Sequence, residues 1–210
     1  MNIHQSGRSM VEMIGVLAIV GVLSVGAIAG YSKAMQKWKV NKTLNEISVL
    51  VFGIVEHLDG LKKVKSTGSY TPLGDMAKKL QIIPNNWKQL SNYQFRDGAN
   101  NFIQVFKEGD RIALDLYLGN VSHSINGQVV GNKFSPAMCL EFVQKIALSV
   151  HASVQQIQGY GFYGTLFYGD EACDGKTKKC VNQVTSEEIL EFCNSCPKSN
   201  SGACAVVLDF

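Results

Sequence analysis

The feature that most constrains this chain is an uncharged apolar segment near its N-terminus. No charged side chain occurs from Met13 to Ser32, and nearly all residues there are apolar or small. At 1.5 Å per helical residue such a segment spans roughly 30 Å, the thickness of a bilayer's hydrocarbon core. Glu12 lies just inside its N-terminal end, where a carboxylate is costly unless a cation pairs with it. The segment predicts a membrane-spanning helix with one acidic group that needs a partner.

The apolar pattern continues beyond this segment at a spacing typical of an amphipathic helix with one buried side: Val40, Leu44, Ile47, Val51, Ile54 or Val55, and Leu58. We therefore expect one helix from about Ser9 to Leu61, membrane-spanning over about 9–32 and amphipathic over 33–61. Asp59-Gly60 is its predicted stop signal, because Gly can adopt the left-handed conformation of a helix C-cap. A secretory signal peptide fits poorly, since residues 1–7 contain no Lys or Arg and the apolar run is too long.

The remaining residues, 62–210, are about as many as one ordinary domain contains. A net charge of +3 with 18% charged residues is too mild to indicate nucleic acid or an acidic substrate as a partner. All six cysteines lie after residue 138, which is typical of a disulfide framework formed in an oxidising compartment. We therefore place this domain outside the cytoplasm, although four lysines after the apolar segment favour the opposite orientation.

Patterning within 62–210 predicts an α+β domain, with an antiparallel sheet packed on the amphipathic part of the first helix. Three helices are predicted, and the first covers 73–80. The second begins at Ser135-Pro136 and buries one apolar side, formed by Met138, Phe142, Ile146 and Val150. The third runs from Thr185, which forms a capping box with Glu188, to about Phe192. The predicted strands are a hairpin of 102–106 with 111–118, then 160–168 and 205–210, with turns at 83–87 and Asn126-Gly127.

The N-terminal pattern resembles that of type IV prepilins: a short polar leader, residues 1–7, ending in Gly7, then Glu12 five residues later, and an apolar helix that becomes amphipathic. The resemblance implies that a prepilin peptidase cleaves between Gly7 and Arg8, that the new amine of Arg8 is methylated, and that Glu12 pairs with the amine of a neighbouring subunit. Arg8 replaces the usual apolar residue, and only His4 in the leader could be cationic.

The family resemblance implies that the chain is a structural subunit. Such subunits leave the inner membrane and polymerise into a helical homo-oligomeric fibre at the bacterial surface. Such pili serve adhesion or motility. The implied partners are the prepilin peptidase, an assembly platform protein and a cytoplasmic ATPase, with no nucleic acid. A pseudopilin of a type II secretion system and a membrane-anchored binding domain that never polymerises are the alternatives.

Several positions in the domain resemble the type IVb pilin subclass: Tyr70-Thr71, the segment 83–87, a hairpin, Cys139 opening a helix, and Cys193-Asn194 ending a short helix before the last strand. This resemblance implies the type IV pilin fold, with a long N-terminal helix on an antiparallel sheet and a disulfide-stapled C-terminal region. In that subclass the equivalent cysteines close one long loop. The seven-residue leader and the two additional cysteine pairs depart from its pattern.

Six cysteines allow fifteen pairings, and the sequence alone cannot choose among them. Two pairs flank short loops rich in turn-forming residues, so each can close its own loop: Cys173–Cys180 and Cys196–Cys204. Cys193 would pair poorly with Cys196 if Cys193 belongs to the helix. Cys139–Cys193 then remains, and the type IVb resemblance implies the same bridge.

Other motifs favour ordinary structure over catalysis. The Cys193–Cys196 spacing could indicate a redox pair or a zinc site, but the motif follows a short helix and lies in an oxidising compartment. Gly159, Gly161 and Gly164 match a dinucleotide fingerprint only in letters, since a strand follows them. A calcium loop at Asp170, Glu171 and Asp174 is less favoured than an acidic surface turn. His57, His123 and His151 lack HExxH spacing, so we expect no enzyme activity, cofactor or metal.

Overall fold

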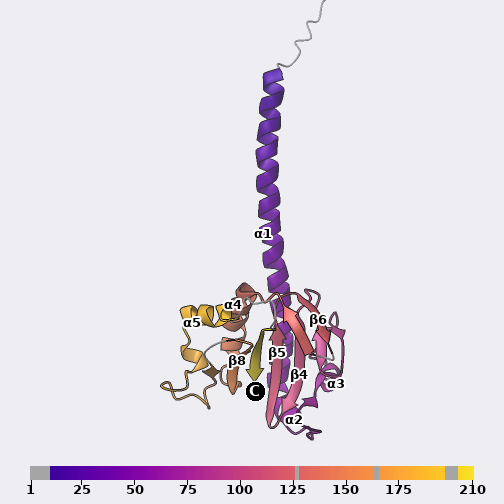
Figure 1. Ribbon diagram of the computed structural model, residues 1–210, viewed down its shortest axis with the longest axis vertical. Coiled ribbons are helices and arrows are strands. Elements are labelled where there is room, and N and C mark those ends of the chain that lie inside the picture. Colours follow the sequence, from indigo (N-terminus) through magenta and orange to yellow (C-terminus); the bar gives the residue numbers. More distant parts are fainter. Residues whose placement is uncertain (1–9, 126–127, 163–165, 197–202) are drawn as a thin grey trace, which may run out of the picture. The chain divides into compact units, whose positions relative to one another are not determined.

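The computed structural model describes residues 10–125, 128–162, 166–196 and 203–210. The structure divides into two compact units, Met1–Asn41 and Lys42–Phe210, which are described separately. The first helix, α1 (Met10–Glu56), contributes residues to both units (Figure 1). Proline, which would remove a backbone donor from the helix, is absent from α1.

The N-terminal helix ends earlier than predicted. α1 stops at Glu56, and after His57 a short helix, α2 (Leu58–Lys62), follows. The predicted stop signal Asp59-Gly60 is wrong, because both residues lie inside α2. A tertiary contact holds the end of α2 instead: the Nζ of Lys107 donates to the carbonyl oxygens of Lys62 (2.5 Å) and Val64 (2.9 Å). A cation there satisfies carbonyl groups that a helix C-terminus leaves unpaired.

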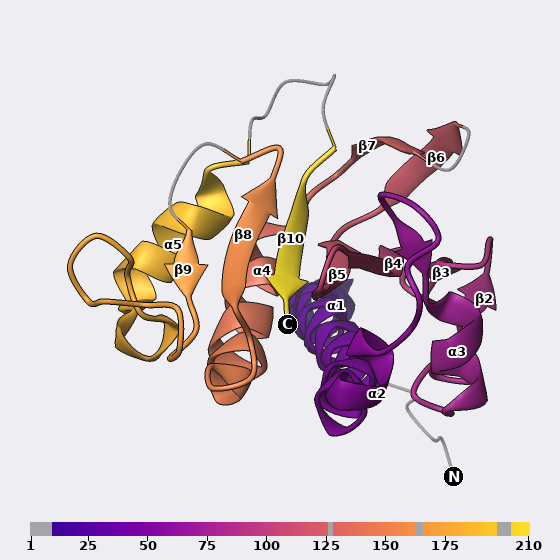
Figure 2. The same ribbon diagram turned by 90° about the horizontal axis from the view of Figure 1, so that it is seen from below.

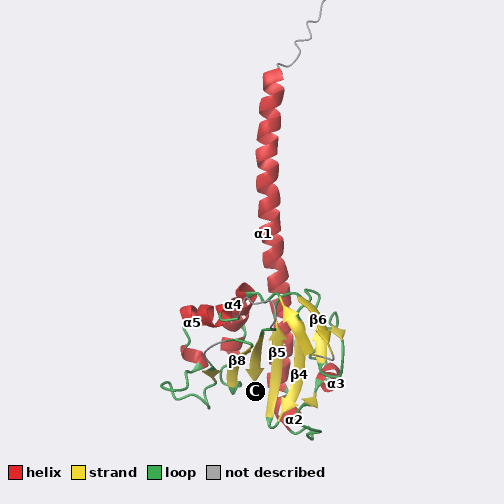
Figure 3. Ribbon diagram, viewed as in Figure 1, coloured by secondary structure: helices red, strands yellow, loops and turns green. Residues whose placement is uncertain are grey.

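The second unit has an α+β layout built on one antiparallel sheet (Figure 3). Its strands run in the order β2-β3-β4-β5-β10-β8-β9, with β1 paired to β4, so the last strand of the chain lies inside the sheet between β5 and β8. The strands are β1 (Thr71–Pro72), β2 (Lys88–Gln89), β3 (Gln94–Arg96), β4 (Phe102–Glu108), β5 (Arg111–Tyr117), β8 (Gln156–Tyr160), β9 (Phe167–Tyr168) and β10 (Ala205–Asp209). β6 (Val121–Ile125) and β7 (Gln128–Asn132) form a separate pair.

One face of the sheet packs on the part of α1 that belongs to the second unit (Figures 1 and 2). Alternate residues of the central strands are buried there: Ile103, Val105, Ile112, Leu114, Leu116, Val206 and Leu208. The predicted apolar side of α1 is buried as well, at Leu44, Ile47, Leu50, Val51 and Ile54. Full burial of one such side chain stabilises a fold by about 1.5–3 kcal/mol, so this contact supplies much of the core.

The turn at 83–87 is held on α1 by polar contacts. Trp87 Nε1 donates to Glu46 Oε2 at 2.9 Å, and Asn86 Nδ2 donates to Glu46 Oε1 at 2.8 Å. The turn itself closes through a backbone hydrogen bond of 3.0 Å from Trp87 to Pro84. Both oxygens of one carboxylate on α1 therefore fix this turn.

The predicted helices are confirmed, with small changes at their ends. They are α3 (Gly74–Lys79), α4 (Pro136–Lys145) and α5 (Ser186–Asn194). The Ser135 side chain caps α4, and the predicted capping box of Thr185 with Glu188 opens α5. The apolar side predicted for α4 is buried, but its last two members follow the helix, because a 3-10 turn at Ala147–Val150 replaces the final α-helical turn.

The predicted hairpin is confirmed as β4 and β5, which turn at Gly109 with a positive φ of 62°. The predicted closing strand is β10. The strand predicted over 160–168 is wrong: β8 ends at Tyr160 and β9 begins only at Phe167. Gly161 between them has φ of 75°, which turns the chain out of the strand. The turn predicted at Asn126-Gly127 lies outside the described residues.

Three disulfides join the cysteines in the favoured pairing. Cys139–Cys193 links α4 to α5 across 54 residues, while Cys173–Cys180 and Cys196–Cys204 span 7 and 8. In the chain-entropy description, the long bridge stabilises by about 4 kcal/mol and each short one by about 2–3 kcal/mol. The long bridge therefore contributes most to holding α5 on α4.

Gly53 provides a direct test of the packing between α1 and the sheet unit. A Cβ at this position would lie 2.5 Å from Ile82 Cγ2 and 2.6 Å from Ile82 Cβ. Gly53→Ala should therefore lower the free energy of unfolding by about 1–3 kcal/mol, as overpacking does. Unfolding of the full chain in detergent, followed by circular dichroism, measures this change.

Gly60→Ala is the matched control, because no atom lies within 4 Å of a Cβ built at this position in α2. We expect its midpoint to stay the same or rise, since Ala favours helix over Gly. Equal losses of stability in the two variants would contradict the close approach of α1 to Ile82.

Candidate functional site

The first candidate site is the exposed apolar surface of α1 within the first unit. Its large side chains are each more than half exposed: Met10, Met13, Ile14, Val16, Leu17, Ile19, Val20, Val22, Leu23, Val25, Ile28 and Tyr31. By length and composition, α1 can cross a membrane. A helix that is apolar on all sides needs lipid or other helices around it.

Glu12 lies in the first turn of α1 and is exposed. A carboxylate at this end of a helix interacts favourably with the helix dipole. The predicted cleavage site at Gly7 and Arg8, and with it the predicted methylation of Arg8, lies outside the described residues. The structure therefore places Glu12 at the start of the apolar surface and gives no geometry for the leader.

The second candidate site is a groove of about 630 Å³ on the sheet face that does not pack on α1. We call this surface the open face. The groove is lined by side chains from β4, β5, β8 and β10, and by Tyr70 and Tyr93 from the connecting segments. In β4, β5 and β10 its members alternate with the buried apolar residues of the opposite face, because successive side chains of a strand point to opposite faces.

Strand register arranges the open face in three rows across β4, β5, β10 and β8. The middle row is Gln104, Asp115, Val207 and Gln158. On one side of it lie Phe106, Ala113, Asp209 and Gln156, and on the other lie Phe102, Tyr117, Ala205 and Tyr160. Asp115 therefore occupies the centre of the open face, with a second carboxylate in one neighbouring row and aromatic rings in the other.

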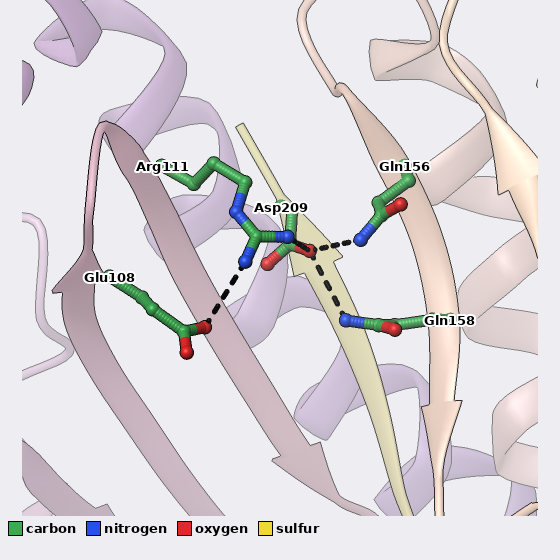
Figure 4. Close-up of polar contacts among 5 residues, drawn as sticks. All are labelled: Glu108, Arg111, Gln156, Gln158 and Asp209. Atoms are coloured by element: carbon green, nitrogen blue, oxygen red, sulfur yellow. Dashed lines mark hydrogen bonds and ion pairs between the residues drawn. The ribbon is translucent and has the colours of Figure 1, made fainter. Parts of the chain in front are cut away.

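Asp209 is buried and receives three donors at its Oδ2 atom (Figure 4). Arg111 Nη1 lies 3.1 Å away, Gln156 Nε2 2.7 Å and Gln158 Nε2 3.2 Å. Arg111 Nη2 also donates to Glu108 Oε2 at 3.3 Å, so the guanidinium of Arg111 bridges two carboxylates. Burial nevertheless raises the pKa of Asp209, an effect that the hydrogen bond from Gln156 and the charge of Arg111 oppose.

Asp115 differs from Asp209 in its surroundings. It is 8% exposed, and no hydrogen bond to its carboxylate is found among the described residues. Burial raises its pKa to about 7, and the nearby charges of Asp209 and Glu108 act in the same direction. A carboxyl group that is half ionised near neutral pH, in the centre of a groove, is typical of a functional site.

Aromatic rings line the groove on both sides of Asp115. The Phe106 ring lies edge to face with Tyr70 at 5.4 Å and with Tyr93 at 6.3 Å between centroids. Tyr117 and Tyr160 form a second pair at 6.2 Å. Burial, with the charge of Asp115 as a smaller cause, raises the pKa of Tyr117, so this phenol stays protonated. The groove therefore combines rigid aromatic walls with a central carboxyl group.

The other sites considered from the sequence do not assemble as functional sites. Cys193 and Cys196 belong to different disulfides, so the redox-pair interpretation is wrong. Gly159 lies in β8, and Gly164 lies outside the described residues. His57 lies between α1 and α2, and the side chain of His123 is also outside the described part.

In the acidic segment after β9, the Asp174 side chain stabilises the turn in which it lies. The Thr177 hydroxyl donates to Asp174 Oδ2, and this bond is the largest cause of the lowered pKa of Asp174. The backbone nitrogens of Lys176, Thr177 and Lys178 donate to its Oδ1 at 2.8 Å and lower the pKa further. Asp170 contacts His151 Nδ1 at 2.7 Å instead. Within the described ranges, no group of three or more potential metal ligands occurs.

The chain was compared with protein-family models, with curated proteins and with solved structures, and none of the three comparisons gave a match.

The groove was not predicted from the sequence, although a signal for it exists. Asp115 and Asp209 are single acidic residues within short strands that are otherwise mostly apolar. Such a residue indicates either a strand end or a buried carboxyl group. Its neighbours could not be inferred, because Arg111 and Asp209 are 98 residues apart.

Asp115 should make the stability of the protein depend on pH. Because its pKa is raised in the folded state, the folded protein keeps a proton that the unfolded chain releases, and stability falls between about pH 4 and pH 7. The difference between 3.8 and about 7, at about 1.4 kcal/mol for each pH unit, corresponds to about 4 kcal/mol. Asp115→Asn should remove most of this loss when denaturant unfolding is measured from pH 4 to pH 8.

Asp110→Asn makes the same chemical change at an exposed residue of the β4–β5 turn. Its pH dependence should match that of the unmodified protein. If Asp115→Asn also retained the full fall in stability, the assignment of a proton to Asp115 would be wrong.

Proposed function

We propose that this chain is the structural subunit of a type IV-like pilus with the type IV pilin fold, and that it polymerises through its N-terminal helix. The observation that supports this proposal most is the apolar surface of α1, exposed on all sides from residue 10 to residue 32 with Glu12 as its only charged side chain. A membrane anchor alone requires such a surface but gives no role to a carboxylate at its start.

Assembly gives Glu12 a role. In a fibre the apolar helices of neighbouring subunits surround one another, and the carboxylate pairs with the N-terminal amine that cleavage after Gly7 creates. A charge removed from water is tolerated when it meets an opposite charge with good geometry. In the same fibre the buried apolar area stabilises by about 25 cal/mol per Å² relative to water.

Moving a subunit from the membrane into the fibre requires an external source of energy. Lipid already shields the apolar helix from water, so moving it into a fibre gains little from the hydrophobic effect. An assembly ATPase in the cytoplasm, acting through a platform protein in the membrane, would supply that energy. The proposed route therefore runs from the inner membrane to an extracellular fibre.

The three disulfides support an extracytoplasmic position for the second unit, since such bonds persist in oxidising compartments. A second candidate function, a membrane-anchored binding domain that stays monomeric, is favoured by the groove on the open face. Filament formation separates the two candidates.

Glu12→Val tests the pilus proposal in cells that express the full chain. The variant should accumulate in the membrane at the normal level, because removing a charge favours insertion. It should yield at least about tenfold fewer filaments, since one buried amine in each subunit contact then lacks its partner. Sheared filaments are quantified by immunoblotting and seen by electron microscopy.

Glu56→Val serves as the control, because Glu56 is an exposed carboxylate at the other end of α1. We expect it to assemble normally. Normal filaments from Glu12→Val would show that the pairing is dispensable, and the absence of any filament from the unmodified chain would favour the monomeric binding domain.

A further inference from the structure

We propose that the groove on the open face binds a small organic cation, an ammonium group on an aliphatic body. This inference concerns the second unit alone and does not depend on polymerisation. It rests on the charges that line the groove, on the aromatic rings around them, and on the carboxyl group of Asp115 at its centre, to which no described residue donates a hydrogen bond.

The charges of the groove are unbalanced. Among the described residues its lining contains Glu108, Asp115 and Asp209 but no Lys, Arg or His. Arg111, beside the groove, bridges Glu108 and Asp209 with its two terminal nitrogens (Figure 4). Asp115 lies one row away, and no described residue donates a charged hydrogen bond to it, so the centre of the groove lacks one positive charge.

The aromatic lining fits a cation that carries apolar groups. Ring faces attract ammonium groups electrostatically, and ring surfaces also bury aliphatic carbon. Tyr70 and Phe106 stand on one side of Asp115, while Tyr117 and Tyr160 stand on the other. Tyr70 and Tyr160 are 62% and 58% exposed, so a ligand can reach both without displacing the core.

Other ligand classes fit less well. A divalent metal ion requires several converging oxygen ligands, and no group of three or more potential ligands is present in the described part of the chain. An anion would meet three carboxylates. A neutral ligand could donate hydrogen bonds but would leave the charge of Asp115 unbalanced, whereas an ammonium group supplies both charge and donors. The groove volume of about 630 Å³ lies in the range of small-molecule sites.

Cation binding should be coupled to the ionisation of Asp115. The described charged and titratable groups around it are Glu108 on β4, Arg111 and Tyr117 on β5, Asp209 on β10, Tyr160 on β8, and Tyr70 and Tyr93 from the connecting segments. A ligand that binds only the ionised carboxylate has an affinity proportional to the ionised fraction. With a pKa of about 7 for Asp115, this predicts affinity about tenfold weaker at pH 6 than at pH 8.

The test uses the full chain in detergent micelles with n-butylammonium chloride as the probe and 1-butanol as its neutral counterpart. Isothermal titration calorimetry at pH 6 and pH 8 should show binding of the amine, about tenfold tighter at pH 8, and no binding of the alcohol. Equal binding of the alcohol, or amine binding that does not change with pH, would overturn the proposal.

Two variants locate the site. Asp115→Asn should weaken amine binding at least about tenfold at pH 8 and remove its pH dependence, while Asp110→Asn in the exposed turn should bind normally. Because Asp115 is buried and its variant could fold poorly, Tyr160→Leu at an exposed ring provides a second measurement. It should weaken binding several-fold, as loss of a cation–π contact does. Unchanged binding by Tyr160→Leu would contradict the proposed groove.

Carboxyl-carbon NMR of the unmodified chain supplies an independent measurement. Saturating n-butylammonium should lower the pKa of Asp115, because a bound cation favours the ionised form. A pKa of Asp115 that does not move under saturating amine would place the ligand elsewhere and overturn the assignment.

Discussion

The rest of the structure depends on what covers the apolar side chains of α1. From residue 12 to residue 32 they lie on all sides of the helix, and the large ones are each more than half exposed. Within the second unit a single stripe is buried under the sheet, while Val49 and Phe52 outside this stripe stay about half exposed. A change from an all-round apolar surface to a single stripe requires two environments along one helix, lipid or other helices first and a folded domain second. A membrane anchor and the proposed assembly subunit both meet that requirement, and the role of Glu12 is what separates them.

Packing on α1 occupies one face of the sheet, and the open face carries polar residues beside a buried apolar cluster that includes Phe102, Tyr117 and Ala205. β10 lies between β5 and β8, so Asp209 from the end of the chain meets Arg111 from the hairpin. The disulfides support this arrangement, since Cys196–Cys204 closes the loop leading to β10 and Cys139–Cys193 ties α5 to α4. The groove therefore depends on the same long-range closure that stabilises the C-terminal region.

Local signals predicted much of this fold. The capping box at Thr185, the N-cap at Ser135, the β4–β5 hairpin and the apolar side of α1 all follow from residues close together in the sequence. The end of α2 could not be predicted in this way, because Lys107, 45 residues away, binds its carbonyl groups. Neither could the groove, since its carboxylates and rings come from strands whose order only the tertiary structure establishes. The strand predicted over 160–168 does not form as one element, because Gly161 adopts a positive φ of 75° that turns the chain after β8.

The central claim, that α1 belongs to a processed assembly subunit, is tested most directly by the intact mass of the chain extracted from membranes of cells with a prepilin peptidase. We predict a mature chain that begins at Arg8, with one methyl group on its terminal amine and three disulfides. A chain that still begins at Met1, or one cut after Ala29 as a secretory signal would be, would contradict it.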